Sequence, residues 1–287
     1  MLVYGSINED IALQVSVFPS PGQTLKAHGS ARATGGKGAN QAAAAALHGA
    51  RVHMIGAVGD DPAGEAARLA LDAAGADTTL VRTEPIVPTG TAYIYVRSDG
   101  ENTIVVDPGA NTKETVDEIP EEVFEEARWC LLSLEVPEDQ VMRFAARARA
   151  HGVKVALNAS PGLDAALEKD LVDVLIVNEG EADAIAGEGW RELGDIADHL
   201  GVEAVVVTQG GDGATVLQRD AAAVHVPAER VKVRDTTGCG DAFAGVMVAA
   251  LTDGCSYADA IGQAARFAGR TAEHPGAMAA YFELHRD

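Results

Sequence analysis

The sequence predicts an α/β fold, a three-layer α/β/α arrangement with a mostly parallel central sheet and a small β-sheet lid. Strand-like apolar segments alternate with helical segments through most of the 287 residues, an order typical of parallel sheets covered on both faces. Two stretches break this order and have the pattern of antiparallel strands. With 47% hydrophobic residues the chain can bury a substantial core, and we expect a single domain over residues 1–287.

The alternation of strands and helices starts at the N-terminus. Residues 2–4 form a first strand segment and residues 52–58 a second. Asp61 and Pro62 then supply the N-cap and first-turn residues of a helix that lasts until Gly75. After residue 129 the predicted strands are 129–134, 153–157, 172–177 and 204–208, and the predicted helices are 138–151, one from Glu179 and one ending near Gly201.

Residues 11–33 and 89–107 interrupt this alternation. The second segment alternates between two faces and returns after a turn at Gly100, which predicts an antiparallel hairpin. The first segment is also strand-like. We expect the two segments to form a small sheet that stands off the main part of the chain as a lid. Such a sheet needs cover on its other face, which a second copy of the chain would supply, so we expect a homodimer.

Charge and cysteine content limit the partners. The formal net charge is −21, which argues against binding of nucleic acid or an anionic membrane because the field repels polyanions. A small phosphate can still be held by helix N-termini, a lysine and a divalent cation. Cys130, Cys239 and Cys255 form no C-x-x-C pair and indicate reduced thiols. The N-terminus has no signal-like segment, so we expect a cytoplasmic protein.

A late glycine turn carries a carboxylate. Gly238 and Gly240 allow successive N–H groups to point into one concavity, and residues 241–251 are predicted as a buried helix whose N-terminus favours an anion. A carboxylate there repels a resting phosphate, so Asp241 fits a base that activates an attacking alcohol. The alternative is that Asp241 is only an N-cap. We interpret Cys239 as small filler between the glycines rather than as a nucleophile.

A second glycine-rich segment precedes an alanine-rich helical stretch at residues 42–47. It is not a Walker A loop, because Lys37 is followed by Gly38 rather than by Ser or Thr. Lys37 and Asn40 instead offer an ammonium group and an amide near a helix N-terminus, which suits hydrogen bonding to a polyhydroxyl compound. The alternative is a tight turn with a solvated lysine.

Polar residues follow several predicted strands, where ligands of open parallel sheets bind. Asn8 and Asp10 follow the first strand, although ordinary turn chemistry also favours them. Glu135 ends another strand. Asn178 and Glu181 stand at a strand-to-helix junction and are compatible with a hydrated magnesium ion, which is often bound by one or two carboxyl-type ligands and several waters.

The strand that ends at Thr208 meets a glycine cluster. Gly210 and Gly213 would let the backbone approach a flat nucleotide or its phosphates closely. A plain hairpin turn explains the same glycines. This cluster alone does not decide between the two.

Four segments together resemble the ribokinase-type, or phosphofructokinase B type, carbohydrate kinases. In chain order they are Gly5-Ser6-Ile7-Asn8-Glu9-Asp10, Gly35-Gly36-Lys37-Gly38-Ala39-Asn40-Gln41, Asn178-Glu179-Gly180-Glu181-Ala182 and Asp235-Thr236-Thr237-Gly238-Cys239-Gly240-Asp241. They span nearly the whole chain in the family's order. The resemblance implies a ribokinase-like fold and transfer of the γ-phosphoryl group of ATP to a primary hydroxyl of a sugar, with D-ribose as the first choice.

The resemblance also implies residue roles. Asp241 would be the base, and the amides of Gly238, Cys239 and Gly240 would form the anion hole with it. The residues that would hold sugar hydroxyls are Asn8, Asp10, Gly36, Lys37, Asn40 and Glu135. The residues that would line the nucleotide site are Asn178, Thr208, Gly210, Gly213 and Gly240. Asn178 and Glu181 would support Mg²⁺ through water.

Two features leave parts of this assignment open. The family uses a monovalent cation, which groups like those of Asp235 and Thr237 would hold beside a C-terminal loop. Here the loop at residues 273–277 lacks the basic residue often seen there, so activation by K⁺ stays open. Tyr93 and Tyr95 on the lid would narrow or alter the sugar pocket, which leaves another sugar or a nucleoside as alternatives. A sugar-binding regulator without catalysis is disfavoured because the residues of both glycine motifs are present.

Overall fold

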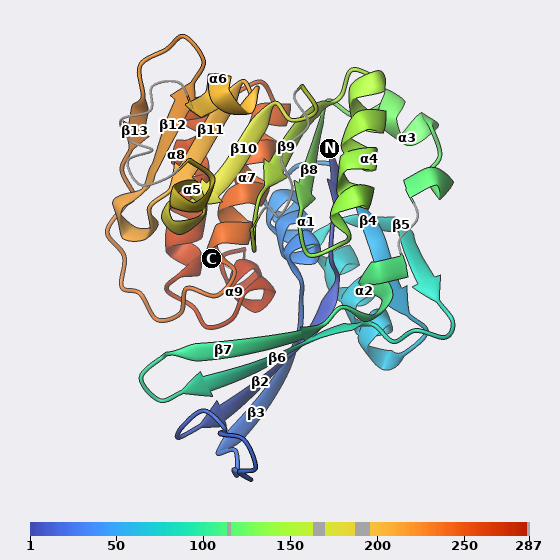
Figure 1. Ribbon diagram of the computed structural model, residues 1–287, viewed down its shortest axis with the longest axis vertical. Coiled ribbons are helices and arrows are strands. Elements are labelled where there is room, and N and C mark those ends of the chain that lie inside the picture. Colours follow the sequence, from blue (N-terminus) through green and yellow to red (C-terminus); the bar gives the residue numbers. More distant parts are fainter. Residues whose placement is uncertain (114–115, 163–169, 187–195, 286–287) are drawn as a thin grey trace.

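The computed structural model describes residues 1–113, 116–162, 170–186 and 196–285. Among these residues, nine strands form one sheet in the order β13-β12-β11-β10-β9-β8-β1-β4-β5, and four form a second sheet in the order β3-β2-β6-β7. Helices flank the large sheet, and the small sheet projects from one end of the molecule (Figure 1). The predicted α/β fold with a mostly parallel sheet and a small lid sheet is confirmed.

The large sheet contains β1 (Leu2–Tyr4), β4 (His53–Gly59), β5 (Asp77–Glu84), β8 (Trp129–Ser133), β9 (Lys154–Asn158), β10 (Val174–Asn178), β11 (Ala204–Thr208), β12 (Ala214–Gln218) and β13 (Val224–Val226). In the order of the sheet, the neighbouring strands β11, β10, β9, β8, β1, β4 and β5 pair in parallel. Strands β12 and β13 are antiparallel additions at the β11 edge. Most of the central parallel strands are runs of buried apolar residues because helices cover both faces. Neither β5 nor β13 is predicted from the sequence, since both are edge strands with mixed exposure.

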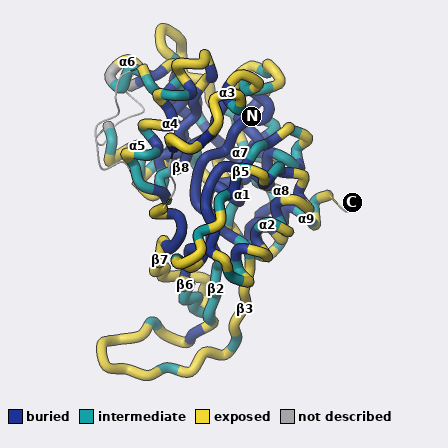
Figure 2. Tube along the Cα trace, turned by 90° about the vertical axis from the view of Figure 1, so that its right-hand side faces the viewer, coloured by how far each residue is buried: buried dark blue, intermediate teal, exposed yellow. Residues whose placement is uncertain are grey.

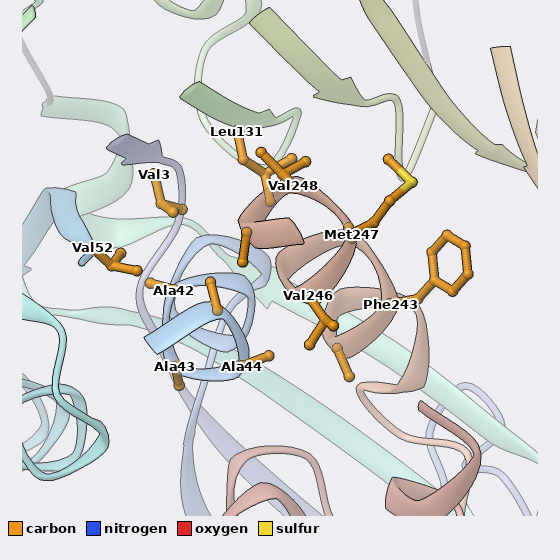
Figure 3. Close-up of a cluster of buried hydrophobic side chains, with 14 of the residues drawn as sticks. Val3, Ala42, Ala43, Ala44, Val52, Leu131, Phe243, Val246, Met247 and Val248 are labelled. Carbon is orange, nitrogen blue, oxygen red and sulfur yellow. The ribbon is translucent and has the colours of Figure 1, made fainter. Parts of the chain in front are cut away.

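Two apolar layers lie on opposite faces of this sheet. The helices of the first layer are α1 (Lys37–Leu47), α2 (Pro62–Ala74), α7 (Cys239–Thr252), α8 (Tyr257–Thr271) and α9 (Met278–Glu283). Those of the second are α3 (Glu122–Glu125), α4 (Glu138–Ala150), α5 (Glu179–Ala186) and α6 (Ile196–Leu200). Within β1, Val3 joins the first layer while Leu2 and Tyr4 join the second, as the two-residue period of a strand requires. Figure 3 shows Val3 and Leu131 beside the side chains of α1 and α7.

Local signals place α2 as the sequence predicts. The Asp61 side chain accepts a hydrogen bond from the Gly64 N–H at 2.8 Å, Pro62 is the first helical residue, and Gly75 ends the helix with a left-handed backbone. None of the described helices combines the length and the apolar character needed to cross a bilayer.

Helices α1 and α7 approach each other closely at Gly245. A Cβ atom there would lie 2.3 Å from the backbone oxygen of Gln41, which is far inside van der Waals contact. The approach matters for the polar end of α7, because Asp241 precedes Gly245 by four residues and therefore lies on the same face of the helix. The carboxylate is thus directed at the N-terminal turn of α1.

The lid sheet consists of β2 (Asn8–Val15), β3 (Gly29–Gly35), β6 (Gly90–Arg97) and β7 (Asn102–Asp107). It contains the antiparallel hairpin predicted in residues 89–107. Asn8 pairs with Gly35 and Gly90 at the base of the lid, beside the large sheet. In Figure 2 the segment that joins β2 to β3 is exposed along most of its length.

The register of the lid corrects the expectation for its two tyrosines. Tyr93 pairs with Ile11 and Tyr95 with Leu13, whereas Asp10 pairs with Ala92. Residues paired across strands point to the same face and alternate along each strand, so both tyrosines lie on the face opposite to Asp10. They therefore do not narrow a pocket that contains the Asp10 carboxylate.

We expect Gly245→Ala to destabilise the protein by about 1–3 kcal/mol, because the added methyl group has no space against α1. Gly262→Ala is the matched control: Gly262 lies within α8, and the nearest atom to an added Cβ is the Arg266 Nη1 at 3.8 Å. There the better helix propensity of alanine should stabilise by about 0.5–1 kcal/mol. Urea unfolding measures both changes; equal effects of the two substitutions would contradict the close approach.

Candidate active site

The glycine turn before α7 is built as a helix N-terminus. Gly238 is the N-cap with φ of 73°, and the helix begins at Cys239, two residues earlier than the predicted range 241–251. Tyr281 Oη donates to the Gly238 carbonyl oxygen at 2.6 Å, and a Cβ at Gly238 would lie 2.4 Å from the Ala277 Cβ. Glycine is therefore required by both backbone and packing. Asp241 lies within the first helical turn, so its interpretation as only an N-cap is wrong.

The Asp241 carboxylate is held from α1 on both oxygens. Asn40 Nδ2 donates to Oδ2 at 3.0 Å, and Gln41 Nε2 donates to Oδ1 at 3.2 Å. Asp241 is 8% exposed, and this burial raises its pKa, while the positive charge of Lys37 and the two amide donors oppose the rise. A fixed carboxylate with a raised pKa is well suited to accept a proton from a hydroxyl group. The predicted residue list omits Gln41, although it follows Asn40 directly.

Cys239 follows the N-cap, where a thiolate would be favoured by the helix dipole. Burial, and then the charges of Asp235 and Asp241, raise the pKa of its thiol to about 11. The thiol is therefore protonated at neutral pH, which agrees with its interpretation as filler rather than as a nucleophile.

Glu135 connects three segments at the carboxyl edge of the sheet. Its Oε2 accepts from Ser6 Oγ at 2.6 Å and from the Lys37 backbone N–H at 3.1 Å. Between these segments Gly36 has φ of 89°, and a Cβ there would lie 2.8 Å from the Asn8 nitrogen. The segment after β1, the start of α1 and the segment after β8 are thus held together by hydrogen bonds.

Asp10 completes a cluster of three carboxylates. Burial, and then the negative charges of Glu135 and Asp241, raise its pKa to about 7. The carboxyl group covers Gly35, because a Cβ there would collide with it. Carboxylates accept hydrogen bonds from hydroxyl groups, so this cluster together with the Lys37 ammonium suits a polyol.

Two adjoining cavities lie beside this cluster and share Thr208 and Gly240. The first, about 200 Å³, borders Asp241; its other lining residues include Lys37, Asn178, Glu181, Thr208, Gly238 and Gly240. The second, about 210 Å³, is mostly apolar; its lining residues include Thr208, Gly210, Gly213, Gly240 and Phe243. All residues predicted for the nucleotide line one of the two. A cavity of about 250 Å³ around Arg51 and Asp253 contains none of the predicted site residues.

Asn178 and Glu181 form a capping box at the start of α5. The Asn178 Oδ1 accepts from the Glu181 N–H at 2.8 Å, and the Glu181 Oε2 accepts from the Asn178 N–H at 2.9 Å. Both residues still line the cavity beside Asp241. Within the described residues no three His, Cys, Asp or Glu side chains gather into a metal site. This donor set fits a magnesium ion that keeps most of its waters.

Asp235 connects the anion turn, residues 235–241, to the C-terminal loop at residues 273–277. Its Oδ1 accepts from the N–H and Oγ1 of Thr237 at 2.9 and 2.7 Å, and its Oδ2 accepts from the Gly276 N–H at 2.7 Å. Burial opposes ionisation, but the Gly276 and Thr237 donors outweigh it and hold the pKa of Asp235 below its usual value. The ionised Asp235 carboxylate therefore links the turn to residues 273–277 by hydrogen bonds.

We expect Asp10→Asn to stabilise the free protein increasingly from about pH 4 to about pH 7, with no further gain above. The wild-type carboxyl has a folded pKa of about 7 against a reference of 3.8, so the folded state keeps a proton that the unfolded state has released, and wild-type stability falls over that window. Thermal melting at a series of pH values measures the difference. A difference independent of pH would show that Asp10 is not desolvated.

The chain resembles known proteins in both sequence and fold. The model of the pfkB family carbohydrate kinases matches residues 1–283. A ribokinase of Haemophilus influenzae is 36% identical over 276 residues, which covers 92% of this chain and 90% of the relative. A deoxyribokinase of Salmonella typhi is 32% identical over 297 residues, covering 97% and 94%. The structure of Arabidopsis thaliana ribokinase complexed with ribose and ATP matches with a TM-score of 0.88 at 29% identity, covering 100% of this chain and 98% of the other. This chain therefore belongs to the pfkB family of carbohydrate kinases.

Proposed function

We propose that this kinase transfers the γ-phosphoryl group of ATP to the primary hydroxyl of D-ribose and forms ribose 5-phosphate. The observation that carries the proposal is the position of Asp241, a buried carboxylate that belongs to the cluster with Asp10 and Glu135 and also lines the cavity with Gly238 and Gly240. The choice of ribose is supported by the ribokinase of Haemophilus influenzae and by the ribose and ATP bound in the Arabidopsis thaliana structure.

The sugar would lie in the cleft below the lid. The residues that hold its hydroxyls are Asn8, Asp10, Gly36, Lys37, Asn40 and Glu135. Because Asn8 and Asp10 lie on the lid while Lys37 and Glu135 lie on the main domain, the sugar would be enclosed between the two sheets. Enclosure excludes water and orients the hydroxyl toward the phosphorus.

In the transfer step, Asp241 accepts the proton of the attacking hydroxyl. The hydroxyl oxygen forms a bond to the γ-phosphorus, the bond from the γ-phosphorus to the β,γ-bridging oxygen breaks, and ADP leaves with that bond's electron pair. The backbone amides of Gly238, Cys239 and Gly240 stabilise the negative charge of the transferring group. Magnesium, when bound through water by Asn178 and Glu181, supplies charge neutralisation on the phosphates.

Local positive charge makes this possible in a protein of net charge −21. The N-terminus of α7 carries a partial positive charge, and the Lys37 ammonium lines the same cavity as Asp241. Both act within a few ångströms of the reacting groups, whereas the distant surface charge is screened by salt.

Deoxyribose is the second candidate substrate, because the Salmonella typhi relative is named a deoxyribokinase. Another sugar or a nucleoside is the remaining alternative. A coupled assay of ADP release with ribose, deoxyribose, other sugars and nucleosides, each with and without K⁺, distinguishes these substrates. Turnover of a nucleoside or another sugar without turnover of ribose would contradict the proposal. The same assay shows whether K⁺, for which Asp235 and Thr237 are the candidate ligands, activates the enzyme.

We expect Asp241→Asn to lower kcat by at least about 10²-fold, the low end for loss of a general base, while sugar affinity measured by calorimetry persists. Asn is nearly isosteric, so the packing against α1 is kept. Asp253→Asn, at the exposed C-terminal end of the same helix, is the control and should leave kcat unchanged. An unaltered rate in Asp241→Asn would remove this residue from the mechanism.

We also propose that the protein is a homodimer through the lid. The support is the pair of exposed apolar side chains on the lid face opposite to Asp10, Tyr93 and Val105, which are 41% and 57% exposed and lie directly across from each other on β6 and β7. A second lid sheet would cover them.

We expect Val105→Glu to dissociate the dimer, because a carboxylate would be buried against an apolar face. The control is Leu69→Glu on α2, outside the lid sheet, whose side chain is 64% exposed. Analytical ultracentrifugation measures both. A wild-type chain that sediments as a monomer, or a Val105→Glu chain that stays dimeric, would contradict the proposal.

A further inference from the structure

The buried side chain of Asn111 bonds the first lid residue. Asn111 lies in a 3₁₀ turn, η1 (Gly109–Lys113), directly after β7, and it is 1% exposed. Its Oδ1 accepts from the Ile7 N–H at 2.9 Å. Its Nδ2 donates to the Ile7 carbonyl oxygen at 3.2 Å and to the Asn8 Oδ1 at 2.8 Å. All three partner groups, the Ile7 N–H, the Ile7 carbonyl oxygen and the Asn8 Oδ1, belong to the junction between the lid and the main domain.

Backbone chemistry determines which way both amides point. A backbone N–H only donates and a carbonyl oxygen only accepts, so the two groups of Ile7 allow Asn111 a single orientation, with Nδ2 toward Asn8. The atom of Asn8 that meets this nitrogen must accept, which makes it Oδ1. The Asn8 Nδ2 is therefore on the opposite side of its amide, and among the described residues it donates no hydrogen bond of its own.

The backbone of β6 leaves this pair little freedom. A Cβ at Gly90 would lie 2.3 Å from the Asn111 Nδ2 and 2.3 Å from the Asn8 Oδ1. The two amides are thus packed directly against the Gly90 Cα, and Asn8 itself is 3% exposed. Rotation of the Asn8 side chain would lose the Asn111 bond without space for a compensating position.

We propose that Asn111 is a positioning residue for sugar binding, which turns the Asn8 amide so that it offers a hydrogen-bond donor to the cleft. The inference rests on the proposed function, in which Asn8 holds a sugar hydroxyl. Asn8 and Asp10 are two residues apart on β2 and share a face. A hydroxyl that donates its hydrogen to a carboxylate keeps lone pairs that need a donor. The Asn8 Nδ2 supplies that donor in a cleft rich in acceptors. The kinase would therefore select a sugar that carries an oxygen atom where it meets Asn8 and Asp10.

The test reverses the amide through Asn111 alone. In the ionised Asn111→Asp side chain one oxygen still accepts from the Ile7 N–H. The other oxygen loses the bond to the Ile7 carbonyl oxygen and requires a donor from Asn8, which turns the Asn8 oxygen toward the cleft. We expect the KM for ribose to rise at least about fivefold, because a polar pair in the cleft is mismatched, while the KM for ATP and kcat change less than about threefold. Asn8→Asp, which keeps its bond from Asn111 but presents an acceptor to the cleft, should give a similar rise.

A double-mutant cycle separates positioning from a structural effect. In an Asn8→Ala background, Asn111→Asp should change the KM for ribose less than about twofold, since there is no amide left to turn. An equal rise with and without Asn8 would overturn the inference. If Asn111→Asp does not fold, Asn111→Ala, which frees the amide instead of reversing it, enters the same cycle.

Two further measurements separate the positioning role of Asn111 from a general disturbance of the turn and from the proposed phosphoryl transfer. Thr112→Ala is the control: it removes the bond from Thr112 Oγ1 to the Gly109 carbonyl oxygen in the same turn and should leave every constant unchanged. An Asn8→Ala protein with unaltered KM for ribose would overturn the inference by removing Asn8 from sugar binding. It would leave phosphoryl transfer, which depends on Asp241, standing.

Discussion

The hydrogen bonds that α1 gives to Asp241 are the contact on which the rest of the site depends. They join residues 201 and 200 positions apart, and they exist because Gly245 lets the two helices approach one methyl group closer than any other residue would. Both helices are preceded by an N-cap glycine with a positive φ angle, Gly36 before α1 and Gly238 before α7. The N-terminal turns of α1 and α7 are thereby brought to one place, where α7 carries the Asp241 carboxylate and α1 carries the two amides that bond it.

The site gathers negative charge that the fold must compensate locally. Asp10, Glu135 and Asp241 repel one another, as the raised pKa of Asp10 reports. The compensation comes from short-range donors: the Ser6 hydroxyl and Lys37 N–H at Glu135, and the amides of Asn40 and Gln41 at Asp241. The repulsion among these carboxylates lowers the stability of the folded protein. A ligand with several hydroxyl groups would reduce this cost by donating hydrogen bonds to them, and functional sites often carry such a stability cost.

The lid is connected to this site through backbone as well as side chains. Its strands β2, β3 and β6 have one end at Asn8, Gly35 and Gly90, which pair with one another beside the large sheet. Asn111 returns from β7 to bond the same place. If the lid tilted about the end where Asn8, Gly35 and Gly90 pair, Asp10 would move relative to Lys37 and Glu135. Asp10 belongs to the lid, whereas Lys37 and Glu135 belong to the main domain.

Local order in the sequence was enough to predict the fold class, the helix from Pro62, the lid hairpin and the glycine turn with its carboxylate, because caps, turns and periodicity act between near neighbours. The edge strands β5 and β13, the outward direction of Tyr93 and Tyr95, and the partners Gln41 and Asn111 could not be predicted in this way. Each is decided by register or by a hydrogen bond between segments far apart in the chain. A single sequence contains the residues of such contacts, but only the packed tertiary structure determines which of them meet.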